Sequence, residues 1–261
     1  MSRFDIRDLP IHSLISFTFL KWKVSLMDYQ EKMRANHING LNEVVGADFL
    51  QLLNRVRHHT MLPPERLYDL YLSRKYVESA KILGDVLEIG VWRGGAIGMS
   101  LLASSSSRLH IGIDTFVGHN EPALDEFDLW GNSMKERWLQ ETQGGKVCWP
   151  ISPFESTHEF LTSLNSASPF QLIKLDILDL DTKDLSVITN SLAILRIDCD
   201  WYPETLKSLE LFWPLLSVGG VLILDDYGHH SGAKKACDEF FAGYNLRFIH
   251  VDYSCITTTK V

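Results

Sequence analysis

The feature that most constrains the fold is an alternation of short apolar segments with helix-like segments from residue 86 onward. Each apolar segment has four to six residues, the length of a buried strand. Segments with the apolar spacing of helices lie between them, at residues 96–103, 205–216 and 232–243, and Gly219-Gly220 is expected to end the second of these. Strands that alternate with helices form a mostly parallel sheet covered on both faces. We expect seven strands, at residues 86–89, 109–114, 170–175, 192–197, 221–224, 246–251 and 255–258.

The first 80 residues carry helical periodicity and almost no strand signal. Between residues 49 and 56 the apolar side chains follow the spacing of one helix face, and Pro63-Pro64 separates this helix from a second one. The predicted organisation is a helical N-terminal extension over residues 1–80 and a second domain over residues 81–261, with an insert at about 117–160 that forms a lid.

The composition is that of a globular protein, with 45% hydrophobic and 22% charged residues. The formal net charge is −8 and no long run of Lys or Arg occurs, which disfavours nucleic acid as a partner. The four cysteines lack Cys-x-x-Cys spacing, which fits a reducing cytoplasm. No stretch reaches the roughly 18 apolar residues of a membrane span. We therefore expect a cytoplasmic protein that acts on a small molecule.

A glycine-rich turn, Glu88-Ile89-Gly90-Val91-Trp92-Arg93-Gly94-Gly95, follows the first predicted strand and precedes a helix. Its glycines let the backbone approach a ligand, and the helix N-terminus favours a negative group such as a carboxylate. The spacing differs from the GxGxxG turn of nicotinamide dehydrogenases, and Glu88 would repel a pyrophosphate. The same acid would attract the ammonium and sulfonium charges of S-adenosylmethionine. The turn therefore favours S-adenosylmethionine over NAD.

A second acid, Asp114, ends the next predicted strand, 26 residues after Glu88 (114 − 88). A carboxylate at this position can accept hydrogen bonds from both hydroxyls of a ribose. The alternative is that Asp114 caps a local turn together with Thr115. We expect the ribose role.

Two pairs of acids follow two later predicted strands. Asp198 and Asp200 come just after one strand, and Asp225-Asp226 directly follows the next. Adjacent strand ends lie about 5 Å apart, so these carboxylates would repel one another unless they are protonated or bound to a cation. A hard divalent ion such as Mg²⁺ prefers oxygen ligands. The alternative is an acidic loop that caps the following helix, for which Glu204 and Thr205 would also serve.

Such a cluster predicts a reaction at a hydroxyl group. A bound cation lowers the pKa of the hydroxyl and stabilises the developing alkoxide, while a carboxylate outside the metal's ligands takes the proton. Asp200 is the best-placed candidate for this base. The acids on both sides of Cys199 would raise its thiol pKa, which argues against a nucleophile. His229-His230 could hydrogen-bond the substrate or act as an alternative base, but they lie in a Gly/Ser-rich loop, and we expect them to be exposed.

Several segments of the chain form a specific combination of motifs. They are Thr60-Met61 with Arg66-Leu67, the stretch from Gly84 to Gly95, Asp114-Thr115-Phe116-Val117-Gly118, the R-x-D-x-D-x-Y segment from Arg196 to Tyr202, and the G-G-x-x-x-x-D-D-Y stretch from Gly219 to Tyr227. In this combination the chain resembles the macrocin O-methyltransferase family. The resemblance covers about residues 59–118 and 190–241.

The resemblance implies an α/β Rossmann-like methyltransferase fold, homodimers and methylation of hydroxyls on sugars or other natural products. It implies Mg²⁺ held by Asp198, Asp225 and Asp226, and a catalytic pair formed by Asp200 as general base with Asp198. Asp176 occupies the position at which related enzymes contact the adenine amine. The residues expected at the cofactor are Thr60, Met61, Glu88, Gly90, Trp92, Arg93, Gly94, Asp114, Thr115, Phe116, Asp176 and Asp198.

The sequence therefore predicts an S-adenosylmethionine-dependent O-methyltransferase with Mg²⁺-assisted deprotonation of a small acceptor. One alternative is a metal-independent N-methyltransferase. Another is a non-catalytic interaction protein on the same scaffold, although a scaffold does not need four clustered carboxylates. The tryptophans of the insert, Trp130, Trp138 and Trp149, either stack on the acceptor or pack in the core.

Overall fold

The computed structural model describes residues 45–104, 106–143, 146–147 and 151–261, so Trp149 and the predicted helical segment before residue 45 lie outside it. The chain divides into two compact units, Met1–Leu50 and Gln51–Val261. Helix α2 (Gly46–Val56) begins in the first unit and ends in the second. It is followed by the 3₁₀ helix η2 (Arg57–His59) and by α3 (Pro64–Ser79), which belongs to the second unit.

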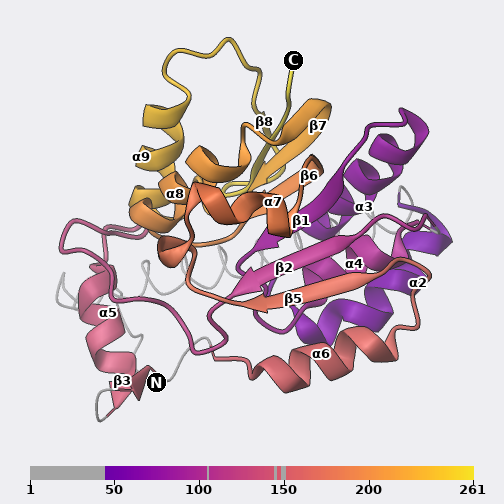
Figure 1. The fold of residues 1–261 in the computed structure, drawn as a ribbon. Helices are drawn as coiled ribbons and strands as arrows, with labels where there is room; N and C mark the ends of the chain where they lie inside the picture. Colours follow the sequence, from indigo (N-terminus) through magenta and orange to yellow (C-terminus); the bar gives the residue numbers. More distant parts are fainter. Residues whose placement is uncertain (1–44, 105, 144–145, 148–150) are drawn as a thin grey trace, which may run out of the picture. The chain divides into compact units, whose positions relative to one another are not determined.

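The second unit is built on a seven-stranded sheet with the order β5-β2-β1-β6-β7-β9-β8 (Figure 1). The first five strands in this order are parallel, and β9 and β8 continue the sheet in antiparallel fashion. The predicted mostly parallel sheet is therefore confirmed. The strands are β1 (Asp85–Ile89), β2 (His110–Asp114), β5 (Phe170–Lys174), β6 (Leu192–Ile197), β7 (Leu216–Leu224), β8 (Ile249–His250) and β9 (Ile256–Thr259).

Helices cover both faces of this sheet, as predicted. Helix α3 packs with α4 (Gly95–Leu102) on one face, and α8 (Tyr202–Phe212) packs with α9 (Ser231–Phe240) on the other (Figure 1). Helix α6 (Phe154–Ser163) precedes β5, and α7 (Leu185–Ile188) precedes β6. Among the described residues, no helix combines the length and apolar character that a membrane crossing requires. The remaining elements are α5 (Met134–Glu141), the strand pair β3 (Thr142–Gln143) and β4 (Lys146–Val147), η3 (Ile177–Asp179) and η4 (Thr182–Asp184).

The strand register brings the predicted acids together. Ile197 at the end of β6 pairs with Ile89 of β1 on one side and with Leu224 of β7 on the other. Backbone hydrogen bonds continue one residue further, from Asp198 N to Ile89 O (2.9 Å) and from Asp225 N to Ile197 O (3.0 Å). The residues that follow three neighbouring strands therefore lie side by side at one edge of the sheet.

The segment between α8 and β7 differs from the prediction. The helix ends at Phe212, and Gly219-Gly220 lies inside β7 instead of ending the helix. Pro214 has no amide hydrogen to continue the helix. Gly219 N donates to Lys260 O (2.7 Å) and Lys260 N donates to Gly220 O (2.9 Å), so the two glycines pair with the end of the chain.

Candidate active site

A cavity of about 320 Å³ lies at the carboxyl edge of the parallel strands. It adjoins the ends of β1 and β6, between which the strand order reverses, and ligands of open α/β sheets bind at such a point. The structure thus gathers most of the predicted site residues around one space. Those that line it are Thr60, Met61, Glu88, Gly90, Trp92, Asp114, Thr115, Asp176, Asp198, Asp200, Asp225 and Asp226.

Three residues that we predicted at the cofactor do not line this cavity. Arg93 is exposed, and its guanidinium carbon lies 4.6 Å from the centre of the Trp92 ring. Gly94 is buried beneath α6. Phe116 is buried and packs edge-on against Phe154, with 5.2 Å between ring centres.

The glycine-rich turn needs a glycine at position 90. The φ angle of Gly90 is +86°, and a Cβ there would lie 1.9 Å from Asp198 O. Any side chain would therefore displace the start of the loop that carries the acids. At Gly95 a Cβ would lie 2.5 Å from Thr60 Cβ, which shows how closely the predicted lead-in segment approaches the turn.

The carboxylate of Asp114 organises the same turn. Its Oδ2 accepts hydrogen bonds from Val91 N (2.7 Å) and Trp92 N (2.8 Å), and its Oδ1 accepts one from Phe116 N (2.6 Å). Asp114 therefore caps its own turn, which was the alternative interpretation, and also lines the cavity as the ribose interpretation requires. Each carboxylate oxygen has two acceptor positions, so Oδ2 is fully used and one position on Oδ1 is left for a ligand.

Asn120 connects two acids at the β5 side of the cavity. Its Nδ2 donates to Asp176 Oδ2 (2.8 Å) and to Glu204 Oε1 (3.0 Å). Asp176 also accepts a hydrogen bond from Leu178 N (3.0 Å), which places its carboxylate at the cavity wall. Sequence reasoning did not identify Asn120.

Arg196 lies at the centre of the acidic cluster. Only 3% of its side chain is exposed, and its guanidinium contacts Glu88 Oε1 (3.2 Å), Asp198 Oδ2 (2.9 Å) and Asp225 Oδ1 (2.9 Å). The residue stands near the end of β6, where its side chain reaches the acids of both neighbouring strands. Its positive charge offsets part of the repulsion between these carboxylates, which we had expected a metal ion to balance.

A second guanidinium approaches the cluster from α3. Arg66 Nη1 lies 2.6 Å from Asp225 Oδ2, and Arg66 Nε lies 2.7 Å from Asp252 Oδ2. Both oxygens of Asp225 are therefore bound by arginines. Burial alone would lower the pKa of Arg66, but the neighbouring charges of Asp225 and Asp252 raise it above its usual value, so Arg66 stays charged.

Burial favours the neutral form of three acids in the cluster, Glu88, Asp198 and Asp226. Burial raises the pKa of Glu88 to about 8, although Arg196 opposes this shift. Burial likewise raises the pKa of Asp198 to about 6 against the same guanidinium. For Asp226, burial and repulsion from Asp200, Asp198 and Asp225 raise the pKa well above its usual value. Asp226 is thus the carboxylate whose ionised form most needs a cation.

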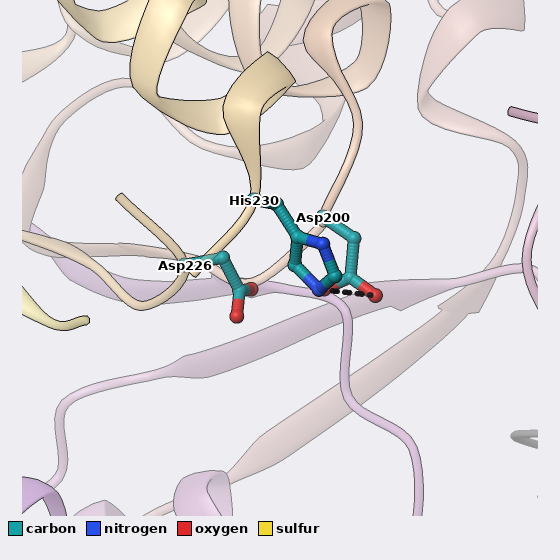
Figure 2. Close-up of side chains that lie close together, drawn as sticks. All are labelled: Asp200, Asp226 and His230. Carbon is teal, nitrogen blue, oxygen red and sulfur yellow. Dashed lines mark ion pairs between the residues drawn. The ribbon is translucent and has the colours of Figure 1, made fainter. Parts of the chain in front are cut away.

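Asp200 has different surroundings. Burial alone would raise its pKa, but His119 and His230 more than offset that effect and hold the pKa of Asp200 below its usual range. His119 Nε2 lies 3.0 Å from Asp200 Oδ2, and His230 Nε2 lies 3.8 Å from the same oxygen. Figure 2 shows the His230 ring edge turned toward Asp200.

The prediction that His229-His230 are exposed is wrong, because His229 is half-buried and lines the cavity and His230 is 8% exposed. Its ring packs against Trp201 with 5.1 Å between ring centres, at the start of α9, so helix packing covers it. His119 was missed by sequence reasoning. The only sequence signal is its place directly after Asp114-Thr115-Phe116-Val117-Gly118. Burial and nearby Glu204 and Asp198 raise the pKa of the Cys199 thiol, as predicted.

The residues present fit a divalent cation. Within the described residues, oxygens of Asp198, Asp225 and Asp226 lie within 4.8 Å of one another, and so do ligand atoms of Asp200, Asp226 and His230. Asp226 belongs to both groups, and its Oδ2 is buried with no hydrogen-bond partner in the described part of the chain. A buried carboxylate oxygen without a partner is costly unless a ligand satisfies it.

A comparison with known protein families shows which family the chain belongs to. The family model described as macrocin-O-methyltransferase (TylF) matches residues 12–137 and 181–260. The chain belongs to the macrocin O-methyltransferase family. The match is wider than the resemblance seen in the motifs, because it includes residues 12–58 and the part of the insert up to residue 137. Residues 138–180 lie outside the match.

Two curated O-methyltransferases are similar to this chain. An 8-demethyl-8-(2,3-dimethoxy-alpha-L-rhamnosyl)-tetracenomycin-C 4'-O-methyltransferase from Streptomyces olivaceus is 30% identical over 196 residues, which is 73% of this chain and 69% of the relative. A mycinamicin III 3''-O-methyltransferase from Micromonospora griseorubida is 30% identical over 226 residues, which is 80% of this chain and 81% of the relative.

Solved structures show the same fold. The O-methyltransferase NovP has a TM-score of 0.64 at 24% identity, with 78% of this chain and 82% of that chain covered. The calicheamicin methyltransferase CalS11 has a TM-score of 0.56 at 16% identity, with 81% and 91% covered. The Rossmann-like methyltransferase fold is therefore confirmed. With the family match, the predicted S-adenosylmethionine-dependent O-methyltransferase activity is confirmed as well.

Proposed function

We propose that the chain methylates a hydroxyl of a sugar carried by a natural product, and that a divalent cation at the acidic cluster assists deprotonation. The observation that carries the proposal is the one cavity that residues expected at the cofactor share with four clustered aspartates. The sugar part is supported by the Streptomyces olivaceus relative, which is named for a rhamnosyl-tetracenomycin.

At the cofactor end, three acids of the cavity wall have separate tasks. Glu88 faces the positive groups of the methionine part, Asp114 accepts from a ribose hydroxyl through its remaining position on Oδ1, and Asp176 accepts from the adenine amine. The close approach at Gly90 leaves room for the ligand where a Cβ would fill the turn. When bound, S-adenosylmethionine supplies an activated methyl group, and a divalent cation supplies positive charge beside the acceptor oxygen.

At the acceptor end, Asp198, Asp225 and Asp226 hold the cation. Arginines already bind both oxygens of Asp225. Asp226, with its unpartnered buried oxygen among the described residues, therefore contributes the strongest single ligand. A hard cation held by a few carboxylates would keep water at its other coordination positions, and hydroxyls of the acceptor could replace that water.

Asp200 takes the hydroxyl proton, beside Asp198. His119 and His230 keep this carboxylate ionised at neutral pH, so it is ready to accept a proton. A carboxylate of lowered pKa is a weak base. The cation is therefore needed to lower the pKa of the acceptor hydroxyl toward that of the base.

We further propose a cytoplasmic homodimer with a helical extension over residues 1–80 and a lid over about residues 117–160. The lid is supported by Asn120, Met134, Arg137 and Trp138, which line the cavity from the insert. Light scattering of the purified chain would test the dimer, which requires twice the mass of 29.8 kDa. A monomer mass would contradict it.

The test of the proposed function uses 4-nitrophenyl α-L-rhamnopyranoside as acceptor, with S-adenosylmethionine and Mg²⁺. The wild type is expected to add one methyl group, detected by mass spectrometry. Asp226→Asn is expected to lose at least about a hundredfold in rate with an unchanged melting temperature, because the cation is lost and no partner of Asp226 Oδ2 is removed. Methylation of an amine analogue instead of the glycoside would overturn the hydroxyl acceptor. Full activity of Asp226→Asn would overturn the cation site.

A further inference from the structure

The loop after β2 brings His119 against Asp200, although the two residues lie on different segments. The imidazole Nε2 is 3.0 Å from Asp200 Oδ2, and the two side chains are 21% and 13% exposed. His230 approaches the same oxygen only to 3.8 Å. His119 is therefore the histidine within hydrogen-bond distance of this carboxylate.

The backbone around His119 is held from several directions. Trp138 Nε1 of α5 donates to His119 O (3.3 Å). Trp201 Nε1 donates to Asn120 O (3.2 Å), and the Asn120 side chain donates to Asp176 and Glu204. The imidazole is consequently presented by a loop fixed to α5, to the start of α8 and to the end of β5.

Trp201 fixes the imidazole from the side. Its ring centre lies 5.4 Å from that of His119 and 5.1 Å from that of His230, so the indole stands beside both histidines that face Asp200. Asp200 itself has a φ of +65°, a backbone conformation that residues other than glycine adopt at a cost in free energy. The surroundings, rather than the local backbone preference, must therefore hold this carboxylate in place.

We propose that His119 is a positioning residue for Asp200. By donating Nε2–H to Oδ2, it fixes the carboxylate plane and leaves the other oxygen to receive the proton of the acceptor hydroxyl. Because Asn120 also contacts Asp176, the same loop links the base to the adenine end of the cavity. This inference rests on the proposed function, in which Asp200 is the base.

The test compares His119→Leu with His119→Gln in the full chain, with 4-nitrophenyl α-L-rhamnopyranoside as acceptor. His119→Leu removes the donor and is expected to lower kcat by about tenfold to a hundredfold, because a misplaced catalytic group reacts slowly. The KM for the glycoside and the Kd for S-adenosylmethionine should stay within about threefold of wild type. His119→Gln, whose amide can donate from nearly the same place as Nε2, should restore kcat to within about threefold. His250→Gln, on the exposed edge strand β8, is the matched control.

Three kinetic outcomes would overturn the proposal. They are wild-type kcat in His119→Leu, equally low kcat in both His119 variants, and a loss of cofactor affinity as large as the loss of kcat. Asp200→Asn separates this inference from the proposed function. If Asp200→Asn stays active, the proposed base is wrong; if it is inactive while His119→Leu is fully active, only the positioning role is wrong.

A measurement that needs no acceptor covers the case in which His119→Leu does not fold or the glycoside is a poor substrate. Nitrogen-15 NMR of the wild-type imidazoles should show an Nε2–H signal that His119→Gln removes and Asp200→Asn shifts. An His119 signal that does not respond to Asp200→Asn would overturn the contact and the proposal with it.

Discussion

At the residue scale, unusual backbone conformations gather at the cavity. Trp92 (φ +47°), Phe116 (φ +56°) and Asp200 (φ +65°) are left-handed although they carry side chains, and two of them line the cavity. Each such residue costs about 1–3 kcal/mol and persists where the surroundings impose it. Hydrogen bonds from Trp92 N and Phe116 N to Asp114 are part of those surroundings. The binding turn is thus preorganised at a cost in stability.

Gly90→Ala tests this preorganisation. The new methyl group would meet Asp198 O in addition to the strain of a left-handed alanine, so we expect a loss of unfolding free energy above about 3 kcal/mol and no measurable cofactor binding. Gly131→Ala is the matched control, since Gly131 has φ +81° but nothing within 4 Å of its added Cβ. Urea denaturation and calorimetry measure both. Equal losses of stability in the two variants would show that contact with Asp198 does not matter.

The sequence was sufficient to predict where the clustered acids lie, because each pair of acids comes just after a strand in the chain. Asp198 and Asp225 directly follow two strands, and parallel strands end at one edge. The partners of these acids depend on tertiary contacts instead. Arg66 comes from α3 and His119 from the loop after β2, and no spacing rule connects either one to its carboxylate. The charge balance of the site could therefore not be predicted from the sequence.

At the element scale, the insert is attached to the first residues of α8 and α9. Glu126 is 2% exposed, and its Oε1 accepts a hydrogen bond from Tyr202 N (2.9 Å) at the first turn of α8. The chain beside it pairs with the start of α9, where Ser231 N donates to Phe127 O (2.9 Å). Helix α5 of the insert was not predicted, although Ser133 and Glu136 have the spacing of a capping box and Ser133 Oγ accepts from Glu136 N.

Glu126→Ala should weaken this attachment. It removes the acceptor at the N-terminus of α8, so we expect the unfolding free energy to fall by about 1–2 kcal/mol and the amide of Tyr202 to exchange faster with solvent. Asp128→Ala is the matched control, because Asp128 caps only residues of the insert itself, Trp130 and Asn132. Hydrogen exchange followed by NMR reports on both variants. Unchanged protection of the Tyr202 amide in Glu126→Ala would contradict the attachment.

His110 joins β2 to α4 and makes stability depend on pH. Its Nε2 lies 3.0 Å from Ser100 Oγ and its Nδ1 lies 3.1 Å from Arg108 O. Burial, with Arg74 nearby, lowers the pKa of His110 from 6.5 to about 3. The unfolded chain therefore binds a proton that the folded chain does not bind between pH 6.5 and pH 3.

His110 therefore makes the folded chain less stable as pH falls. As pH falls through this range, protonation favours the unfolded state, and His110 alone lowers the unfolding free energy by up to about 1.4 kcal/mol per pH unit. His110→Gln should show a shallower decline than wild type in urea denaturation between pH 6.5 and pH 4. Parallel pH profiles of wild type and variant would mean that His110 titrates normally in the folded chain.

At the scale of the whole molecule, the alternation of strands and helices determines the sheet and its ligand edge. The crossing from β5 to β6 places the switch point beside β1, and the cavity lies there. The strand order and the location of the cavity follow from the order of the elements along the chain and from the handedness of the crossovers. The insert does not, because α5 and the loop before it follow no alternation and their position depends on contacts such as that of Glu126. The insert is consequently the region that sequence reasoning predicted least.

The most direct measurement of the central claim is the initial rate of methyl transfer from S-adenosylmethionine to 4-nitrophenyl α-L-rhamnopyranoside after removal of divalent cations with EDTA. We predict that the rate falls at least about a hundredfold and returns when excess Mg²⁺ is added, since the acidic cluster then regains the charge that lowers the hydroxyl pKa. Undiminished methyl transfer in EDTA would contradict cation-assisted deprotonation at Asp198, Asp225 and Asp226.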